Sequence, residues 1–258
     1  SAPVSDPASD DILYDVFVEN LPTYYFGITY TKNTSVSSPA CVSYIKMRNN
    51  YNGSQFSEHT ELENVQVTAV HEFFHAIQFS YNCYERFWFM EATAVWSEDE
   101  LYNNVNDHYR YISSWFSNIN KSLDDESSHM YGSFIFFQYI DEHLGGPNTI
   151  RLCWEKSHEL ASPIQDNSIE SINSALNDLG SSFEETYLRM RIANKIMNTN
   201  AGLYSYEEAD GYRSAGGYPL ESDIFYQKGI PQENTYLSLD LFETIYYKIH
   251  TSDPIKIE

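Results

Sequence analysis

The sequence is poor in basic residues and has no long apolar run. Its 258 residues include 15 Lys and Arg against 37 Asp and Glu, which gives a formal net charge of −22. A field of that sign repels nucleic acid and anionic membranes, so the composition excludes a nucleic-acid-binding protein and favours solubility and cationic ligands. No stretch of ~18 apolar residues is present, so we expect no transmembrane helix.

Cysteine is also scarce. The three cysteines are Cys41, Cys83 and Cys153, and none belongs to a Cys-x-x-Cys pair, so no cysteine zinc site is expected. Three are too few for a disulfide-stapled scaffold, and an odd number allows one disulfide at most with one thiol left free. The sequence leaves their pairing and the redox compartment open.

Apolar and aromatic residues are plentiful, at 42% and 16% of the chain, which is enough for one large core. Stretches 24–31 and 41–48 predict strands, and residues 201–258, rich in Tyr, Gly and Pro, predict two more at 236–241 and 244–249. Helical periodicity predicts helices over about 61–80, 88–102, 107–119, 130–143, 148–157, 169–177 and 183–197. We therefore expect an α+β fold, with a main domain over 1–200 and a β-rich extension of unknown role over 201–258.

The strongest chemical signal is the H-E-F-F-H sequence at residues 71–75. Two histidines four residues apart lie one turn apart on the same helix face, so the imidazoles of His71 and His75 can converge on one ion. Ring nitrogens suit zinc, at Zn–N distances of ~2.0–2.1 Å. Glu72 then lies beside the metal, where it can take a proton from water.

The same sequence could be two surface histidines on an amphipathic helix, and three features argue against that reading. A capping box of Thr60 and Glu63 starts the helix well upstream, so the motif lies in mid-helix. Its apolar neighbours indicate burial: Val70, Phe73, Phe74 and Ile77. Buried His and Glu need polar partners, and a metal ion supplies one.

The motif needs a third ligand. The metzincin pattern would require glycine and histidine where this chain has Gln78 and Tyr81, so it does not apply. Glu91, 16 residues after His75, is the best candidate, because it lies in an apolar helical stretch beside small alanines that allow close helix packing. Other acidic residues compete with it: Glu85, Glu98 and Glu100.

His71-Glu72-x-x-His75 with Glu91-x-x-Ala94 resembles the gluzincin metallopeptidases, the thermolysin-like clan. The longer phrases at 71–78, 88–96 and 131–134 are similar to a group of uncharacterised secreted microbial metallopeptidases, and the resemblance covers roughly residues 24–160. It implies a zincin-like catalytic domain whose α/β upper part carries the active-site helix and whose lower part is helical. It also implies Zn²⁺, hydrolysis of protein or peptide substrates, and a secreted or extracellular location.

The chain departs from the thermolysin pattern at one point. That pattern has an aspartate four residues after the glutamate ligand to orient a ligand histidine, and this chain has Val95 there. We therefore expect the orienting acid elsewhere, with Glu98 and Asp99 as candidates.

Gluzincins also place a Tyr or His on a later helix to donate to the oxyanion. Here Tyr131 is the first choice and His129 the second. The resemblance further puts strand 42–48 where clan members pair an edge strand with the substrate, although it could equally be an ordinary sheet strand. The remaining histidines lie in polar contexts and are expected at the surface: His59, His108, His143, His158 and His250.

Two other functions fit the same residues. A degenerate zincin-like module could bind peptide or glycan without turnover, although a purely structural zinc site has no use for Glu72 as a base. A zinc hydrolase could instead act on a non-peptide substrate, and the sequence does not separate that reading from proteolysis.

Overall fold

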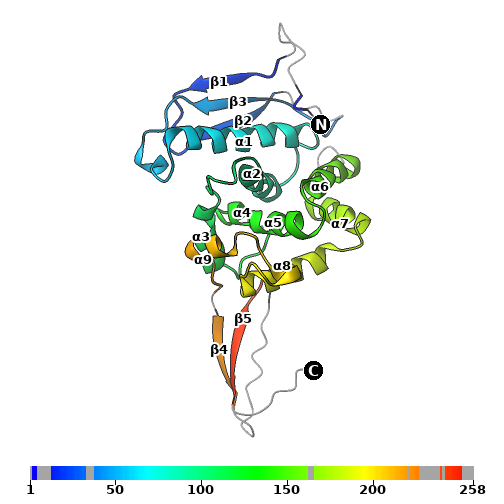
Figure 1. The fold of residues 1–258 in the computed structure, drawn as a ribbon. Helices are drawn as coiled ribbons and strands as arrows, with labels where there is room; N and C mark the ends of the chain where they lie inside the picture. Colours follow the sequence, from blue (N-terminus) through cyan, green and yellow to red (C-terminus); the bar gives the residue numbers. More distant parts are fainter. Residues whose placement is uncertain are drawn as a thin grey trace.

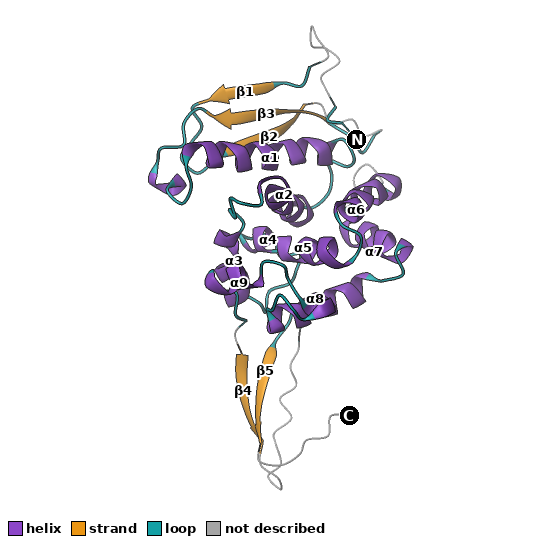
Figure 2. Ribbon diagram, viewed as in Figure 1, coloured by secondary structure: helices purple, strands orange, loops and turns teal. Residues whose placement is uncertain are grey.

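The computed structural model describes residues 2–4, 13–32, 38–161, 166–219, 221–226, 239 and 242–251. These residues form an α+β fold, as predicted, with a small N-terminal sheet above a mainly helical body (Figure 1; Figure 2). Among them, no helix combines the length and the apolar character that crossing a membrane requires.

The N-terminal sheet contains β1 (Val16–Glu19), β2 (Gly27–Lys32) and β3 (Val42–Arg48). β3 lies in the centre, parallel to β1 and antiparallel to β2. Of the two readings of the strand at 42–48, the ordinary sheet strand is the correct one, because β3 has a hydrogen-bonded neighbour on each side. The free edge that lies close to the predicted active-site helix belongs to β2.

The predicted active-site helix is α1 (Glu61–Phe79), which packs along the sheet (Figure 1). Its capping box is confirmed: the Glu63 backbone N–H donates to the Thr60 hydroxyl, and the Thr60 N–H donates to the Glu63 carboxylate. Ala76 of α1 meets Ile45 of β3 in a small apolar cluster. The sheet and the motif helix are therefore joined by direct packing.

α2 (Phe87–Tyr102) packs against α1 and leads into the helical body. A disulfide between Cys41 and Cys83 ties the start of β3 to the loop before α2, and Cys153 is a buried free thiol. Both small residues of the Glu91 segment, Ala92 and Ala94, are fully buried. α2 therefore forms the layer between the sheet unit and the remaining helices.

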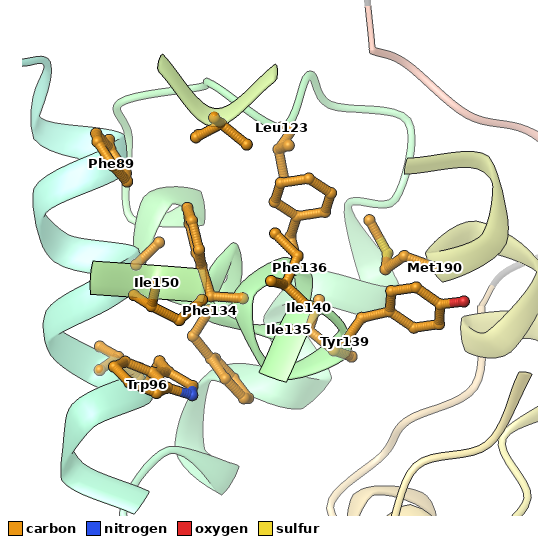
Figure 3. Packing of buried hydrophobic residues seen from close by; sticks show 14 of the residues in the cluster. Phe89, Trp96, Leu123, Phe134, Ile135, Phe136, Tyr139, Ile140, Ile150 and Met190 are labelled. Atoms are coloured by element: carbon orange, nitrogen blue, oxygen red, sulfur yellow. The ribbon is translucent and has the colours of Figure 1, made fainter. Parts of the chain in front are cut away.

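The helical body surrounds one large apolar core. Rings from α2 and later helices stack there, as in Phe89 against Trp154 at 4.1 Å, and Figure 3 shows further members around Phe134 and Ile140. Its elements follow the predicted helices closely, except that the helix expected at 130–143 is divided at Ser133. They are α3 (Tyr109–Ser117), α4 (His129–Gly132), α5 (Phe134–His143), α6 (Pro147–Leu160), α7 (Ser168–Asp178) and α8 (Phe183–Ile196).

The change of composition at residue 201 does not mark a boundary of the fold. The structure places a 3-10 helix (Gly202–Tyr204) and α9 (Ala209–Ser214) there instead of strands. Tyr206 and Tyr212 are fully buried in the same core as α5, so packing joins this segment to the helical body.

The β-rich part begins later, where β4 (Glu221–Tyr226) and β5 (Tyr246–Thr251) form a parallel pair that projects from the helical body (Figure 1). The strand predicted at 244–249 is thus found two residues further along. The one predicted at 236–241 lies outside the described residues except for Leu239.

Candidate metal centre

α1 and α2 bring the three predicted ligands together. Nε2 of His71 lies 3.1 Å from one carboxylate oxygen of Glu91, and Nε2 of His75 lies 3.6 Å from the other. One ligand atom from each residue falls within 4.8 Å of the others. Ligands held at ~2.0–2.1 Å from one tetrahedral ion are themselves ~3.4 Å apart, so two imidazoles and a carboxylate at these separations fit zinc.

The competing acids lie elsewhere. Glu85 accepts a hydrogen bond from the Ser157 hydroxyl at 2.5 Å, in a buried contact between the α1–α2 loop and α6. Glu100 is exposed on α2. Glu98 lies behind the metal group, by which we mean His71, His75 and Glu91, and is not part of it.

Each histidine is oriented by a hydrogen bond at its other nitrogen. Nδ1 of His71 lies 2.6 Å from Oε1 of Glu98, and Nδ1 of His75 lies 2.7 Å from the Gln78 amide oxygen. Such outer partners fix the ring orientation and raise ligand basicity. Glu98 therefore lies where the acid that orients a ligand histidine was expected. It reaches the same ring as Glu91 because two residues seven apart lie on the same face of a helix.

The structure directs the other candidate, Asp99, away from this group and towards His108. Gln78, which occupies the position where the metzincin pattern has glycine, was not anticipated as a histidine partner. Its own amide N–H₂ donates to the Met90 carbonyl and to the Thr93 hydroxyl, so its oxygen is fixed towards His75.

The electrostatics of this group favour a bound cation. Burial by itself lowers the pKa of His71, but hydrogen bonds and charges from Glu91 and Glu98 outweigh it and hold the pKa well above the usual value. Burial likewise favours the neutral form of Glu91, yet the pKa of Glu91 is lowered because His75 and His71 attract its charge. Glu91 is therefore a carboxylate over the physiological range, as a metal ligand must be.

Glu72 is fixed against the edge strand. Its carboxylate accepts a hydrogen bond from the Thr29 hydroxyl, with 2.7 Å between Thr29 Oγ1 and Glu72 Oε2. Gly27 leaves the space for it, because a Cβ atom at position 27 would lie 2.6 Å from Glu72 Cγ. Sequence patterns identified Glu72 but neither of these partners, since the contact joins residues more than 40 positions apart.

Two adjoining cavities open beside the metal group, of about 220 Å³ and about 250 Å³. Both are lined by Gly27, His71, Glu72 and two tyrosines, Tyr25 and Tyr131. The first continues over side chains that, except for Val67, are polar or aromatic: Tyr24, Phe26, Val67, Thr68, Glu98, Asp107, Arg110 and Tyr111. The second continues along β2 and over side chains of α1 and α2, about half of them apolar: Ile28, Thr29, His75, Phe79, Phe87, Met90 and Glu91.

The two candidate oxyanion donors are placed differently. Tyr131 on α4 lines both cavities and stacks on Tyr111 with 5.2 Å between ring centroids. Burial, and then the charges of Glu91, Glu72 and Glu98, raise the pKa of Tyr131, so its phenol keeps the proton that a donor needs.

His129 lies in neither cavity. It is buried against the face of Trp115, with ring centroids 4.4 Å apart, and burial lowers its pKa to about 4. The structure therefore brings Tyr131 to the metal group and leaves His129 in the helical body.

The prediction that the remaining histidines lie at the surface is wrong for His108. Its side chain is fully buried, with Asp99 on one side and Glu208 on the other. Its polar sequence neighbours suggested exposure, but the distant segment that carries Glu208 covers it.

Comparison with known proteins identifies a family whose function is unknown. Residues 42–178, slightly more than half of the chain, match the model of a family of unknown function (DUF6055). No curated protein and no solved structure matches the chain. The matched range contains both histidines, Glu72 and Glu91 of the metal group, together with Tyr131.

Proposed function

The chain belongs to the DUF6055 family, and we propose that it is a zinc-dependent metallopeptidase of the gluzincin type with a zincin-like fold. One observation carries the proposal: His71, His75 and Glu91 converge beside two cavities, with the carboxylate of Glu72 held next to them. A metal site that served only to stabilise the fold would be closed, whereas a catalytic site keeps an open position for water and substrate.

Each residue of the site has a separate role in the proposed reaction. Nε2 of His71, Nε2 of His75 and the Glu91 carboxylate would hold the ion, which when bound lowers the pKa of water to near ~7 and polarises a carbonyl. Glu72 accepts the proton of the attacking water and returns it to the leaving amine. The Thr29 hydroxyl keeps that carboxylate in place through its hydrogen bond.

Tyr131 is the proposed hydrogen-bond donor to the oxyanion. Its protonated phenol lines the same cavities as Glu72 and can donate to the oxyanion that develops on the substrate carbonyl. The five lining residues that the two cavities share put Glu72 and Tyr131 on one cleft.

The free edge of β2 supports a peptide substrate. Among the residues that the structure describes, β2 pairs with β3 along one side only, and its residues Gly27, Ile28 and Thr29 line the cavity beside the metal group. An extended peptide can add to such an edge through main-chain hydrogen bonds. Thr29 of the same strand donates a hydrogen bond to the Glu72 carboxylate, so a peptide bound at this edge would present its carbonyls next to the proposed base.

A secreted or extracellular location is part of the proposal. The disulfide between Cys41 and Cys83 supports it, because disulfides persist in oxidising compartments and are rare in the cytosol.

The test is cleavage of casein or gelatin by zinc-loaded protein, with and without a zinc chelator. Activity should disappear with the chelator and return with added zinc. Glu72→Gln should lower turnover by ~10²–10⁴-fold, because it removes the base, while the zinc content stays unchanged.

Glu61→Gln is the matched control, since Glu61 is an exposed carboxylate on the same helix, and it should behave as wild type. If zinc-loaded wild type cleaves no protein and binds peptides as well as Glu72→Gln does, the chain is a binding module instead.

A further inference from the structure

A second group of metal-binding side chains lies near the C-terminal end of α2, outside the proposed catalytic site. Asp99, His108 and Glu208 each offer one ligand atom, and these atoms fall within 4.8 Å of one another. The three residues come from three separate segments: α2, the residue before α3, and the residue before α9. The proposed peptidase mechanism does not use any of them.

The contacts within this group leave buried polar atoms without partners. Nε2 of His108 lies 3.0 Å from Glu208 Oε2, an ordinary hydrogen-bond distance. On the other side of the ring, Nδ1 of His108 and Oδ1 of Asp99 face each other at 3.6 Å, and among the described residues neither has a hydrogen-bond partner. His108 is fully buried and Asp99 is 4% exposed, so neither of these two unpartnered atoms faces open solvent.

A separation of 3.6 Å is long for a hydrogen bond but suits two ligands of one ion. Bonds of ~2.1 Å that meet at a near-tetrahedral angle place the ligand atoms ~3.4 Å apart. The same 3.6 Å separates His75 Nε2 from Glu91 Oε1 in the first metal group. Unpartnered buried polar atoms destabilise a fold, and an ion between Asp99 and His108 would give both atoms a partner.

The surrounding charge also favours a cation. The charge of Asp141 acts on Asp99 together with that of Glu208. Among the described residues, Asp99 and Glu208 form ion pairs with His108 alone and with no Lys or Arg. Negative charge is therefore concentrated here with little to offset it.

We propose that a second divalent transition-metal ion binds between Asp99 and Nδ1 of His108, while Glu208 holds the opposite ring nitrogen, as Glu98 does at His71. The ion would fasten the loop between α2 and α3 onto α2 and, through His108 and Glu208, the segment 202–214. The first site has two imidazoles and one carboxylate, whereas one imidazole and one carboxylate meet here; this pair, completed by water, also suits Zn²⁺ or Mn²⁺, whereas Ca²⁺ takes ~6–8 oxygen ligands. The loop that the ion holds leads into Asp107 and Arg110 of the first cavity wall. The ion would thus also support the substrate cleft from behind.

Metal stoichiometry tests the proposal independently of peptidase activity. After loading with ZnCl₂ and dialysis, elemental analysis of the full chain should give two zinc ions per wild-type chain. The His71→Ala/His75→Ala variant should keep one ion, and Asp99→Asn should also keep one, from the other site. Glu100→Gln, which removes the neighbouring exposed carboxylate, should keep two.

Thermal unfolding of chelator-treated protein gives a second readout. Added ZnCl₂ or MnCl₂ should raise the unfolding temperature of His71→Ala/His75→Ala, and this rise should vanish when Asp99→Asn is added. If Asp99→Asn does not fold, Glu208→Gln, which changes the partner of the opposite ring nitrogen, should reduce the rise in the same background.

One zinc in wild type and none in His71→Ala/His75→Ala would overturn the second site. A single zinc that is lost in Asp99→Asn and kept in His71→Ala/His75→Ala would do the opposite. That result would support the second site and contradict the proposed function.

Discussion

Oε1 of Glu98 lies 2.6 Å from Nδ1 of His71, while Nε2 of the same ring faces the carboxylate of Glu91. One imidazole is therefore held between two carboxylates that lie about two turns apart on α2. In the proposed metal site, the first would be a ligand and the second would orient the ring. If the site is of the gluzincin type, as proposed, Glu98 takes the part of the aspartate that the thermolysin pattern places at the position of Val95.

We expect Glu98→Gln to weaken zinc binding without removing a ligand. Loss of an outer partner of a metal-binding histidine costs ~10–100-fold in affinity, because the ring loses both its orientation and the negative charge behind it. Competition with a chelator of known affinity measures the change. Glu100→Gln, two residues away and exposed, is the control; equal affinities for the two variants would contradict the role given to Glu98.

We expect Gly27→Ala to lower turnover while zinc content stays at the wild-type level. The added methyl group would lie 2.6 Å from Glu72 Cγ and would have to displace the proposed base. A misplacement of ~1 Å can reduce the rate of catalysis ~10²-fold. Gly53→Ala is the control, since its methyl group meets only the flexible side chain of Gln55. An unchanged kcat for Gly27→Ala would mean that Glu72 is not the base or is free to move.

Tyr131→Phe should lower kcat by ~10²–10³-fold with little change in KM or zinc content, the pattern of an interaction made mainly in the transition state. Steady-state kinetics on a peptide substrate, with elemental analysis of the same samples, measures both. An active Tyr131→Phe together with an inactive His129→Gln would move the donor to His129, against its burial on Trp115.

Glu85 should make the protein less stable as pH rises. Burial raises the pKa of Glu85 to about 8 from 4.5, and the neighbouring Asp166 adds to the shift. A carboxyl whose pKa is higher in the folded state binds its proton more tightly there. Its contribution to stability is therefore complete below about 4.5 and is lost as pH rises through about 8.

Glu85→Gln mimics the protonated form, because its amide oxygen can still accept from Ser157 and Asn82. Between about pH 5 and 8, the thermal midpoint of wild type should fall relative to that of Glu85→Gln. Glu61→Gln should follow wild type. Parallel curves for wild type and Glu85→Gln would show that the carboxyl does not titrate in this range.

The disulfide should be detectable by counting thiols. Denatured, non-reduced protein should react at Cys153 alone, and reduction should release the two thiols of Cys41 and Cys83. Replacing both with serine should lower the free energy of unfolding by ~2–4 kcal/mol, because the bridge closes a long loop. Three reactive thiols before reduction would rule out the bridge.

Local sequence was enough for the helices and for part of the site. The capping box at Thr60 and Glu63 and the helical periodicity predicted α1 to within a residue. The spacing of His71 and His75 put both rings on one helix face, because that spacing is set by helix geometry alone. The choice of Glu91 came from a charged residue in an apolar stretch, and the structure brings it to the histidines.

The rest was decided by packing between elements that are far apart in sequence. Nothing near Glu72 indicates that Thr29 and Gly27 of β2 would hold it, and nothing near His108 shows that Glu208 would cover it 100 residues later. The pairing of Cys41 with Cys83 and the central position of β3 have the same origin. Residues three or four apart are fixed by the helix, whereas contacts between separate elements depend on how their apolar faces fit together, and only the folded chain determines that fit.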